Sequence, residues 1–382
     1  MQITHGDYFI DNILNGLVRT LDPTRPFARQ SPCSFTDVGN DLSSGESHAN
    51  SLEPCINAGI ENYRKLMAEN VVSFASECAI LGPDTMESLR RYMPEDKLWP
   101  LNDYWRDRLM DNPYASIRMD FLDRELLYMT DLYGKPETLE QFVKRGMTVH
   151  SEIVRAEYEY ARSHKGRCGG ILGWMYSDIW PTGSWVLVNY YGEPKQAYYA
   201  MKRAFRPVMI TFVQNKDGET DFVAVNDTKR PVKIRAKFGW SDTDGNREKL
   251  GSTETEIAEN GVYRIPIGEI VPNSNRYLYA QAKIDNREET VIYSPEFWKG
   301  FKFESCYEKK VKQISEEEIE VVICAHKLLK NLCVFTEQNE YTDYSDNYID
   351  VEAGKSATIK VFRKGGIKAE ELKFTDFAAV TE

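Results

Sequence analysis

Two patterns of hydrophobic and polar positions divide this chain. Up to about residue 207, short apolar runs alternate with longer stretches in which apolar residues recur at helical spacing. From residue 208 onward, short β-rich runs are separated by turn-forming residues at intervals of about ten residues. The pattern predicts a mixed α/β part over 1–207 and an all-β part over 208–382.

The stretch over 168–207 shows the clearest succession of predicted elements. Residues 169–176 form a short apolar run, which suits a fully buried strand, and Pro181 and Gly183 then force a turn. Pro194 suits the first turn of a following helix, which Pro207 stops. One apolar stripe on this helix consists of Ala197, Met201, Ala204 and Phe205. Strand, loop and amphipathic helix make one βα unit, whose functional groups lie at the end of the strand.

Five further elements are predicted before this unit. Asp7 caps a helix over 7–20, and 27–31 form a short strand. Residues 71–77 form a strand that ends in a carboxylate, Glu77. Asp84 caps a helix that runs to about residue 92. Residues 101–165 are mostly helical, with a long helix started by Pro136, whereas 33–60 read as a polar loop.

The all-β part divides near residues 298–304. Turn chemistry between short strands, without a long helix, is typical of immunoglobulin-like sandwiches, although the Cys, Trp and Cys spacing of true immunoglobulin domains is missing. The strands predicted before the boundary are 208–213, 221–226, 232–238, 262–266, 277–284 and 290–293. Those predicted after it are 311–314, 318–324, 332–336 and 356–362.

Composition narrows the class of protein. Hydrophobic residues make up 42% and aromatic residues 12%, enough for several packed cores. The net charge of −11 argues against nucleic acid or an anionic membrane as a partner. No apolar run is long enough to span a bilayer, and the start lacks a signal-peptide pattern. Seven cysteines without a CxxC pair favour free thiols in a reducing, cytoplasmic compartment.

Candidate chemistry gathers where the strand of the 168–207 stretch ends. Trp174, Trp180 and Trp185 lie there with a carboxylate, Asp178. Indole faces can stack on the C–H faces of a sugar, and a carboxylate accepts hydrogen bonds from its hydroxyls. The residues therefore favour a carbohydrate site.

The same stretch resembles the last βα unit of the catalytic barrel in glycoside hydrolase family 2, most of all in the β-mannosidases. The family's run Trp-Gln-Leu-Asn-Asp stands here as Trp174-Met-Tyr-Ser-Asp178. Ser76-Glu77 and Leu98-Trp99-Pro100 resemble the family's seventh strand and the segment after it. Gly45-Glu-Ser-His48 resembles its Gly-Asp-x-His segment, and Ser31-Pro32 the end of its fifth strand. Residues 345–350 resemble a segment of the terminal sandwich of β-mannosidases.

The resemblance implies a multidomain α/β plus all-β fold. It implies strands five to eight of a TIM (β/α)8 barrel over 1–207, an immunoglobulin-like sandwich over 208–300 and a terminal one over 301–382. In a retaining glycosidase one carboxylate attacks the anomeric carbon and a second carboxyl acts as acid and base. The resemblance makes Glu77 the nucleophile, places Trp174 under the sugar with Asp178 beside it, and adds His48 as a substrate-binding residue. It implies no metal and no cofactor.

The acid/base residue is the gap in the resemblance. The family uses the Glu of an Asn-Glu pair that ends strand four, and no Asn-Glu precedes the first predicted helix. The pair Asn339-Glu340 lies in the last predicted sandwich. We therefore expect the chain to be a C-terminal portion that is inactive alone and needs the missing N-terminal half of the barrel as its partner.

Several alternatives stay open. Glu77 can be a surface charge, Trp174 a packed side chain, Asp178 a turn cap and His48 a solvated loop residue. The family also contains β-galactosidases, β-glucuronidases and exo-β-glucosaminidases. A non-catalytic carbohydrate-binding relative is favoured by the truncation and by Ala49, Cys78 and Met175, which depart from the family pattern. Sugar, linkage and oligomeric state do not follow from the sequence.

Overall fold

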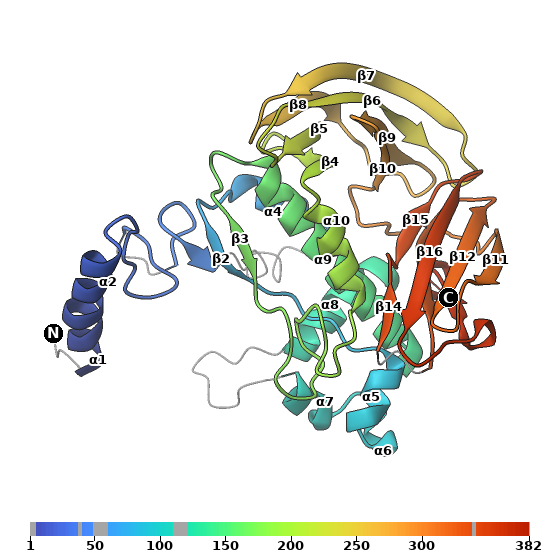
Figure 1. Cartoon of the computed structure of the whole chain (residues 1–382), viewed down its shortest axis with the longest axis horizontal. Coiled ribbons are helices and arrows are strands. Elements are labelled where there is room, and N and C mark those ends of the chain that lie inside the picture. Colours follow the sequence, from blue (N-terminus) through green and yellow to red (C-terminus); the bar gives the residue numbers. More distant parts are fainter. Residues whose placement is uncertain (1–4, 37–39, 49–59, 110–120, 338–340, 382) are drawn as a thin grey trace.

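The computed structural model describes residues 5–36, 40–48, 60–109, 121–337 and 341–381. A group of helices occupies the middle of the molecule (Figure 1). A small parallel sheet lies on one side of these helices, and two groups of antiparallel strands lie on the other sides. The predicted change from mixed α/β to all-β near residue 207 is seen in the order of the elements.

The parallel sheet has three strands in the order β1 (Ser47–His48), β2 (Ala75–Cys78) and β3 (Ile171–Gly173). The prediction of a fully buried strand over 169–176 is wrong: β3 has three residues, and Leu172 is 54% exposed. The cause is its place in the sheet, because in the part of the chain that the structure describes β3 pairs only with β2. A strand with one free edge keeps part of its surface in solvent.

The helices pack around one long helix, α9 (Leu139–Ser163), which contacts α8 (Phe121–Tyr133) and α10 (Gln196–Ala204). The buried face of α9 includes Phe142, which meets the ring of Trp105 edge-on at 5.0 Å. The shorter helices are η2 (Ile60–Asn62), α4 (Tyr63–Glu69), α5 (Met86–Tyr92), α6 (Glu95–Leu98) and α7 (Asp103–Arg108).

Two helix starts differ from the prediction. Thr85, not Asp84, caps α5, since its side chain accepts a hydrogen bond from the backbone N–H of Ser88 at 3.2 Å. Asp84 is instead buried, and its carboxylate lies 3.6 Å from the ammonium group of Lys195. The long helix begins at Leu139 after its cap Thr138, not at Pro136.

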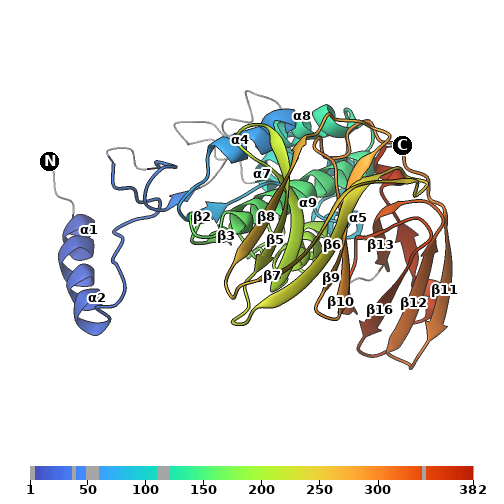
Figure 2. The same cartoon turned by 90° about the horizontal axis from the view of Figure 1, so that it is seen from above.

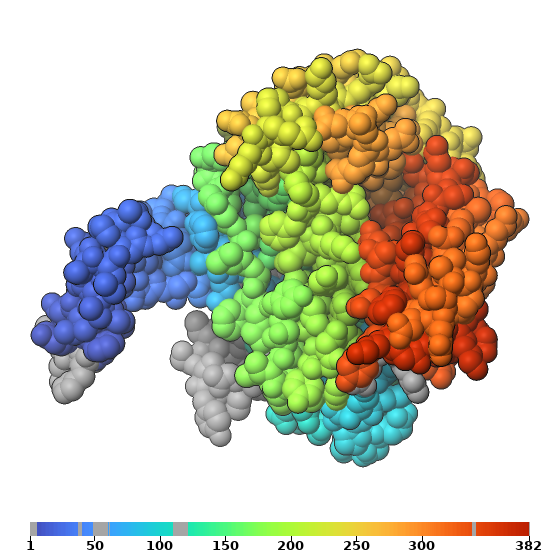
Figure 3. Space-filling model, viewed as in Figure 1, coloured from blue at the N-terminus to red at the C-terminus, as the bar shows by residue number. Residues whose placement is uncertain are grey.

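The N-terminal helical segment stands apart from the rest of the molecule (Figures 2 and 3). It runs through α1 (His5–Tyr8), the π-helical turn η1 (Phe9–Leu14) and α2 (Asn15–Leu21), close to the predicted helix over 7–20. Its apolar side chains Phe9, Ile13, Leu14, Leu17 and Leu21 are exposed. The strand predicted over 27–31 is absent from the described structure. Among the described residues, no strand lies beside 27–31 to pair with it. The nearby pairing is an isolated bridge between Cys33 and Glu46.

The first antiparallel group consists of two sheets on one core. One sheet has the order β10-β9-β6-β7 and the other β4-β5-β8. Phe212 and Phe222 from one sheet share this core with Phe238 from the other. The strands are β4 (Val208–Gln214), β5 (Glu219–Asn226), β6 (Val232–Ser241), β7 (Arg247–Ile257), β8 (Val262–Glu269), β9 (Tyr277–Ile284) and β10 (Arg287–Tyr293). The prediction located six of these and missed β7.

The second antiparallel group follows residue 306 and has its own core around Val321, Leu332 and Ile359. Its sheets have the orders β11-β12-β16-β14 and β15-β13-β17. The strands are β11 (Tyr307–Gln313), β12 (Glu318–Ala325), β13 (Leu329–Phe335), β14 (Thr342–Tyr344), β15 (Ile349–Val351), β16 (Ser356–Arg363) and β17 (Lys373–Thr375). The short η3 (Ala369–Glu371) and α11 (Ala378–Thr381) complete it.

Among the described helices, none combines the length and the apolar character that crossing a bilayer requires.

Candidate active site

The candidate site lies where the three parallel strands end. His48 closes β1, Glu77 is the third residue of β2, and Trp174 directly follows β3. The pairing register sets His48 opposite Glu77, and the backbone N–H of Trp174 donates to the carbonyl of Cys78 at 2.8 Å. Parallel strands bring their carboxyl ends to the same edge of a sheet, so these three residues from distant parts of the chain become neighbours.

Glu77 and His48 place a carboxylate beside an imidazole at this edge. The Nδ1 atom of His48 lies 3.6 Å from Oε2 of Glu77. Their side chains are 25% and 22% exposed, which leaves both reachable from solvent. A half-buried carboxylate with an imidazole beside it can act as a nucleophile, as a base or as a hydrogen-bond acceptor for a hydroxyl.

Ser31 holds the far side of the imidazole ring. Its Oγ lies 3.1 Å from Nε2 of His48, 3.1 Å from a carboxylate oxygen of Glu46 and 3.3 Å from Oγ of Ser76. Asn40 fixes the backbone of His48 from both sides: its Oδ1 accepts from the N–H at 3.0 Å, and its Nδ2 donates to the carbonyl at 3.2 Å. These contacts orient the ring toward Glu77.

Trp174 presents a large apolar surface at the end of β3. Its side chain is 47% exposed, although Trp is a residue that proteins usually bury. The peptide bond that links it to Met175 is cis. An open indole at the end of a strand can stack on the C–H face of a sugar.

Asp178 lies in a buried cluster, away from that edge. Its Oδ1 accepts from Oγ of Ser184 at 2.7 Å, and burial raises the pKa of its carboxyl. In the part of the chain that the structure describes, no contact joins it to Glu77 or His48. Trp180 lies under the guanidinium of Arg108 at 5.2 Å. Asp178 is thus connected to the loop that carries Trp174 but not to the pair formed by Glu77 and His48.

Lys195 is the centre of the buried cluster. Its Nζ donates to the carbonyl of Gly82 at 2.5 Å and to that of Ser184 at 2.8 Å, and lies 3.6 Å from Oδ1 of Asp84. Gly82 belongs to the loop after β2, and Ser184 to the loop after β3. One buried ammonium group therefore ties together the loops that follow Glu77 and Trp174.

Burial shifts the acid–base behaviour of the groups around Lys195. It raises the pKa of Asp84 to about 7, with Lys195 opposing the shift, and that of Glu125 to about 8. It lowers the pKa of His150 well below its ordinary value, and Lys195 adds to that decrease. These groups supply a neutral to weakly charged support beneath the loops.

Sequence reasoning missed Lys195, Glu125 and Ser31 as parts of the site or its support. One feature of the sequence could have indicated Lys195. It directly precedes the amphipathic helix of the 168–207 stretch, where the candidate sugar-binding residues lie. The contacts of Glu125 and Ser31 join segments far apart in the chain, which spacing cannot reveal. The departure at Ala49, the pair Asn339-Glu340 and one of the seven cysteines, Cys55, lie outside the described residues.

A search of the described residues finds no group of three or more His, Cys, Asp or Glu side chains arranged to hold a metal ion. The six cysteines in this part of the chain are free.

No family model matches the chain. It is similar to β-mannosidase B of Aspergillus niger, with 28% identity over 274 residues, which are 65% of this chain and 32% of the relative. It is also similar to β-mannosidase B of Aspergillus terreus, with 22% identity over 395 residues, which are 95% of this chain and 44% of the relative. The chain thus spans less than half the length of these curated relatives.

The fold has similar solved structures. The β-D-mannosidase of Dictyoglomus thermophilum superposes with a TM-score of 0.84 at 20% identity, covering 97% of this chain and 45% of that one. The exo-chitosanase CsxA of Amycolatopsis orientalis gives 0.61 at 16% identity, over 80% of this chain and 42% of that one. These two matches show similarity of fold, whereas the similarity to proteins named β-mannosidase comes from the sequence comparison. Together they support the resemblance read from the sequence: the chain is similar to β-mannosidases in sequence and in fold.

Proposed function

We propose that the chain forms part of a retaining exo-β-glycosidase that removes terminal β-linked mannose, with Glu77 as the nucleophile. The observation that carries the proposal is the position of Glu77 beside His48, where neighbouring parallel strands end. The β-mannosidase names of the sequence relatives support the choice of sugar.

In the proposed reaction, a carboxylate oxygen of Glu77 attacks the anomeric carbon and the bond to the leaving oxygen breaks. The leaving oxygen takes a proton from a general acid, and water later hydrolyses the glycosyl ester with retention of configuration. Trp174 stacks on the C–H face of the sugar. His48, oriented by Ser31, binds a hydroxyl next to the reacting carbon. Asp178 and Lys195 hold the loop under Trp174, so Asp178 supports the site through that loop.

The general acid is proposed to come from polypeptide beyond this sequence. The relatives are more than twice as long as the part that matches here, so they have room for further catalytic segments. We also propose that the parallel strands belong to a (β/α)8 barrel over 1–207, and that 208–300 and 301–382 are two immunoglobulin-like sandwiches. The two cores shared by antiparallel sheets support the sandwiches, and the free edge of β3 suits a barrel strand whose second neighbour lies elsewhere. The missing half of the barrel would then be the partner of this chain.

A related function has support from the fold. The similarity to an exo-chitosanase favours a second candidate, a family 2 glycosidase that acts on another β-linked sugar. A set of aryl β-glycosides that differ only in the sugar separates the two. Preference for the mannoside supports the first candidate, and preference for the glucosaminide supports the second.

The nucleophile is tested with 2,4-dinitrophenyl 2-deoxy-2-fluoro-β-mannoside, whose leaving group needs no general acid. Mass spectrometry of the treated chain is expected to find the fluoroglycosyl group on Glu77, and Glu77→Gln is expected to abolish it. Glu95→Gln, at an exposed carboxylate of α6, is the matched control and should label like the unmodified chain. Labelling of another carboxylate, or binding of the reagent without labelling, would overturn the assignment and favour a non-catalytic carbohydrate-binding protein.

A further inference from the structure

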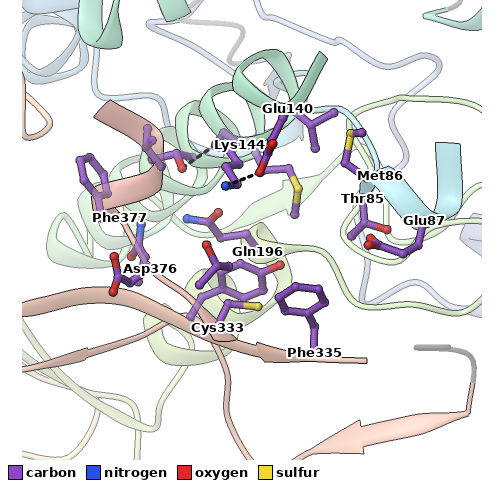
Figure 4. Close-up of a pocket in the computed structure, with 17 residues that line it drawn as sticks. Thr85, Met86, Glu87, Glu140, Lys144, Gln196, Cys333, Phe335, Asp376 and Phe377 are labelled. Atoms are coloured by element: carbon purple, nitrogen blue, oxygen red, sulfur yellow. Dashed lines mark hydrogen bonds and ion pairs between the residues drawn. The ribbon is translucent and has the colours of Figure 1, made fainter. Parts of the chain in front are cut away.

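A cavity of about 160 Å³ lies between the helices and the second antiparallel group (Figure 4). Its walls come from the start of α5, one face of α9, the start of α10, strand β13, and residues 375–380. The candidate active-site residues Glu77, His48 and Trp174 are not among its lining residues. The cavity is therefore separate from the site at the strand ends.

Two amide groups on different walls of this cavity have unused donors. Gln196, the first residue of α10, is 4% exposed, and its Nε2 has no hydrogen-bond partner. The Nδ2 atom of Asn331, in β13, is also buried without a partner. Figure 4 shows the Gln196 side chain in the space between α9 and β13. Buried amide donors are normally paired, so two unused ones in one cavity indicate a ligand that offers acceptor oxygens.

The other walls of the cavity carry aromatic rings and carboxylates, which can contact the C–H and hydroxyl groups of a polyol. Phe335, Tyr348 and Phe377 supply aromatic surface for C–H groups. Glu87 and Asp376 supply carboxylates, which accept hydrogen bonds from hydroxyl groups. The cavity thus combines donors, acceptors and aromatic faces.

Charge and size limit the ligand further. Lys144 is the cation among the lining residues, and its Nζ is already paired with Glu140 at 2.7 Å. The carboxylates of Glu87 and Asp376 therefore repel an anion. The volume is close to the ~150 Å³ cavity that accommodates benzene, so one six-membered ring fits, with its substituents toward the open side.

We propose that this cavity binds one neutral monosaccharide, held by the amides of Gln196 and Asn331, at a site distinct from the one around Glu77. The ligand contacts both the helices and the second antiparallel group, so its binding stabilises their association. The proposal does not depend on catalysis by Glu77.

Titration calorimetry of the full chain with D-mannose tests the proposal. Saturable binding is expected in the unmodified chain. Gln196→Leu should weaken it by about tenfold, because it removes one donor and keeps the size of the side chain. The matched control is Glu95→Gln, an exposed carboxylate that lies outside both the cavity and the site around Glu77, and it should change the affinity by less than about twofold. D-mannuronate, which adds a negative charge to the same ring, should bind about tenfold more weakly than D-mannose.

Three results would overturn the inference. They are no saturable binding, unchanged affinity in Gln196→Leu, and mannuronate binding as tightly as mannose. Thermal unfolding of each variant checks that it is folded. If Gln196→Leu is unfolded, Phe335→Leu is tested in its place. Unchanged affinity for mannose in Phe335→Leu would also overturn the inference. Loss of the fluoroglycosyl label from Glu77 with intact mannose binding would overturn the proposed function alone.

Discussion

At the scale of single residues, the buried carboxyl of Glu125 makes stability depend on pH. The side chain is 3% exposed, both of its oxygens are unpaired, and burial raises its pKa from 4.5 to about 8. Between these values the folded chain keeps the proton and the unfolded chain releases it. The free energy of unfolding therefore falls as pH rises through this window, by up to ~1.4 kcal/mol per pH unit. Asp84, whose pKa is raised from 3.8 to about 7, acts in the same direction.

We predict that Glu125→Gln removes the larger part of this dependence. The variant should be close to the unmodified chain near pH 5 and more stable near pH 8, as measured by urea unfolding across that range. Exposed Glu137→Gln serves as the control and should leave the slope unchanged. Parallel curves for Glu125→Gln and the unmodified chain would show that Glu125 is not the titrating group.

A second residue, Gly82, is predicted to tolerate no side chain. A Cβ atom there would lie 2.4 Å from Nδ1 and 2.5 Å from Cβ of His150. Since α9 fixes His150, Gly82→Ala should lower the free energy of unfolding by about 1–3 kcal/mol through overpacking. At Gly183 the nearest atom to an added Cβ is 3.6 Å away. Gly183→Ala should stay within about 0.5 kcal/mol in the same denaturant titration. Equal losses in both variants would contradict this account.

The predictions of single residues came from local motifs. Ser76-Glu77 and Trp174 were found by resemblance, and the structure brings the strands that hold them side by side. Asp178 was expected beside the sugar, and the structure puts it in the cluster around Lys195. Its hydrogen-bond partner Ser184 lies in the same loop, but Lys195 also pairs with Asp84 from the loop after β2, and spacing along the chain could not predict that neighbour.

At the scale of elements, β6 had an apolar face and was predicted, whereas β7 lacked one and was missed. β6 alternates buried and exposed residues, and its predicted range was nearly right. β7 is mostly exposed and reads Arg-Glu-Lys-Leu-Gly-Ser-Thr-Glu-Thr-Glu-Ile, without an apolar alternation. It is a strand because ten of its 11 residues pair with β6. Pairing of this kind depends on tertiary contact rather than on local pattern.

The start of the longest helix gives a prediction at this scale. The side chain of Thr138 accepts from the backbone N–H of Gln141 at 3.2 Å and caps α9. Thr138→Ala should cost about 1 kcal/mol in the free energy of unfolding, because a buried helix loses the partner of one N–H group. Thr130 is an exposed threonine inside α8, and Thr130→Ala should be neutral or slightly stabilising. Chemical unfolding of both variants tests the cap, and equal effects would rule it out.

At the scale of the whole molecule, the helices and the second antiparallel group are joined by buried charges as well as by apolar contact. Arg203 on α10 donates to Asp346 at 2.7 Å and to the carbonyls of Asn347 and Tyr348. Lys330 on β13 is 1% exposed, and its Nζ lies 2.8 Å from Oε1 of Glu152 on α9. The resemblance predicted a boundary near residue 300 but not how firmly the parts on either side of it are attached.

Lys330 provides the test of that attachment. Its Nζ also lies 3.6 Å from Asp350 and 4.8 Å from the ring centroid of Trp298. Lys330→Met should lower the free energy of unfolding by about 3–5 kcal/mol, because Glu152 is left charged and buried without its partner. The double variant Lys330→Met with Glu152→Leu should recover most of that loss, because it removes both charges of the pair. Lys360→Met breaks an exposed pair with Glu318 and should cost no more than about 1 kcal/mol. Denaturant unfolding followed by tryptophan fluorescence measures all three. If Lys330→Met costs no more than Lys360→Met, the two parts are held by apolar packing, and the buried pair does not contribute to their association.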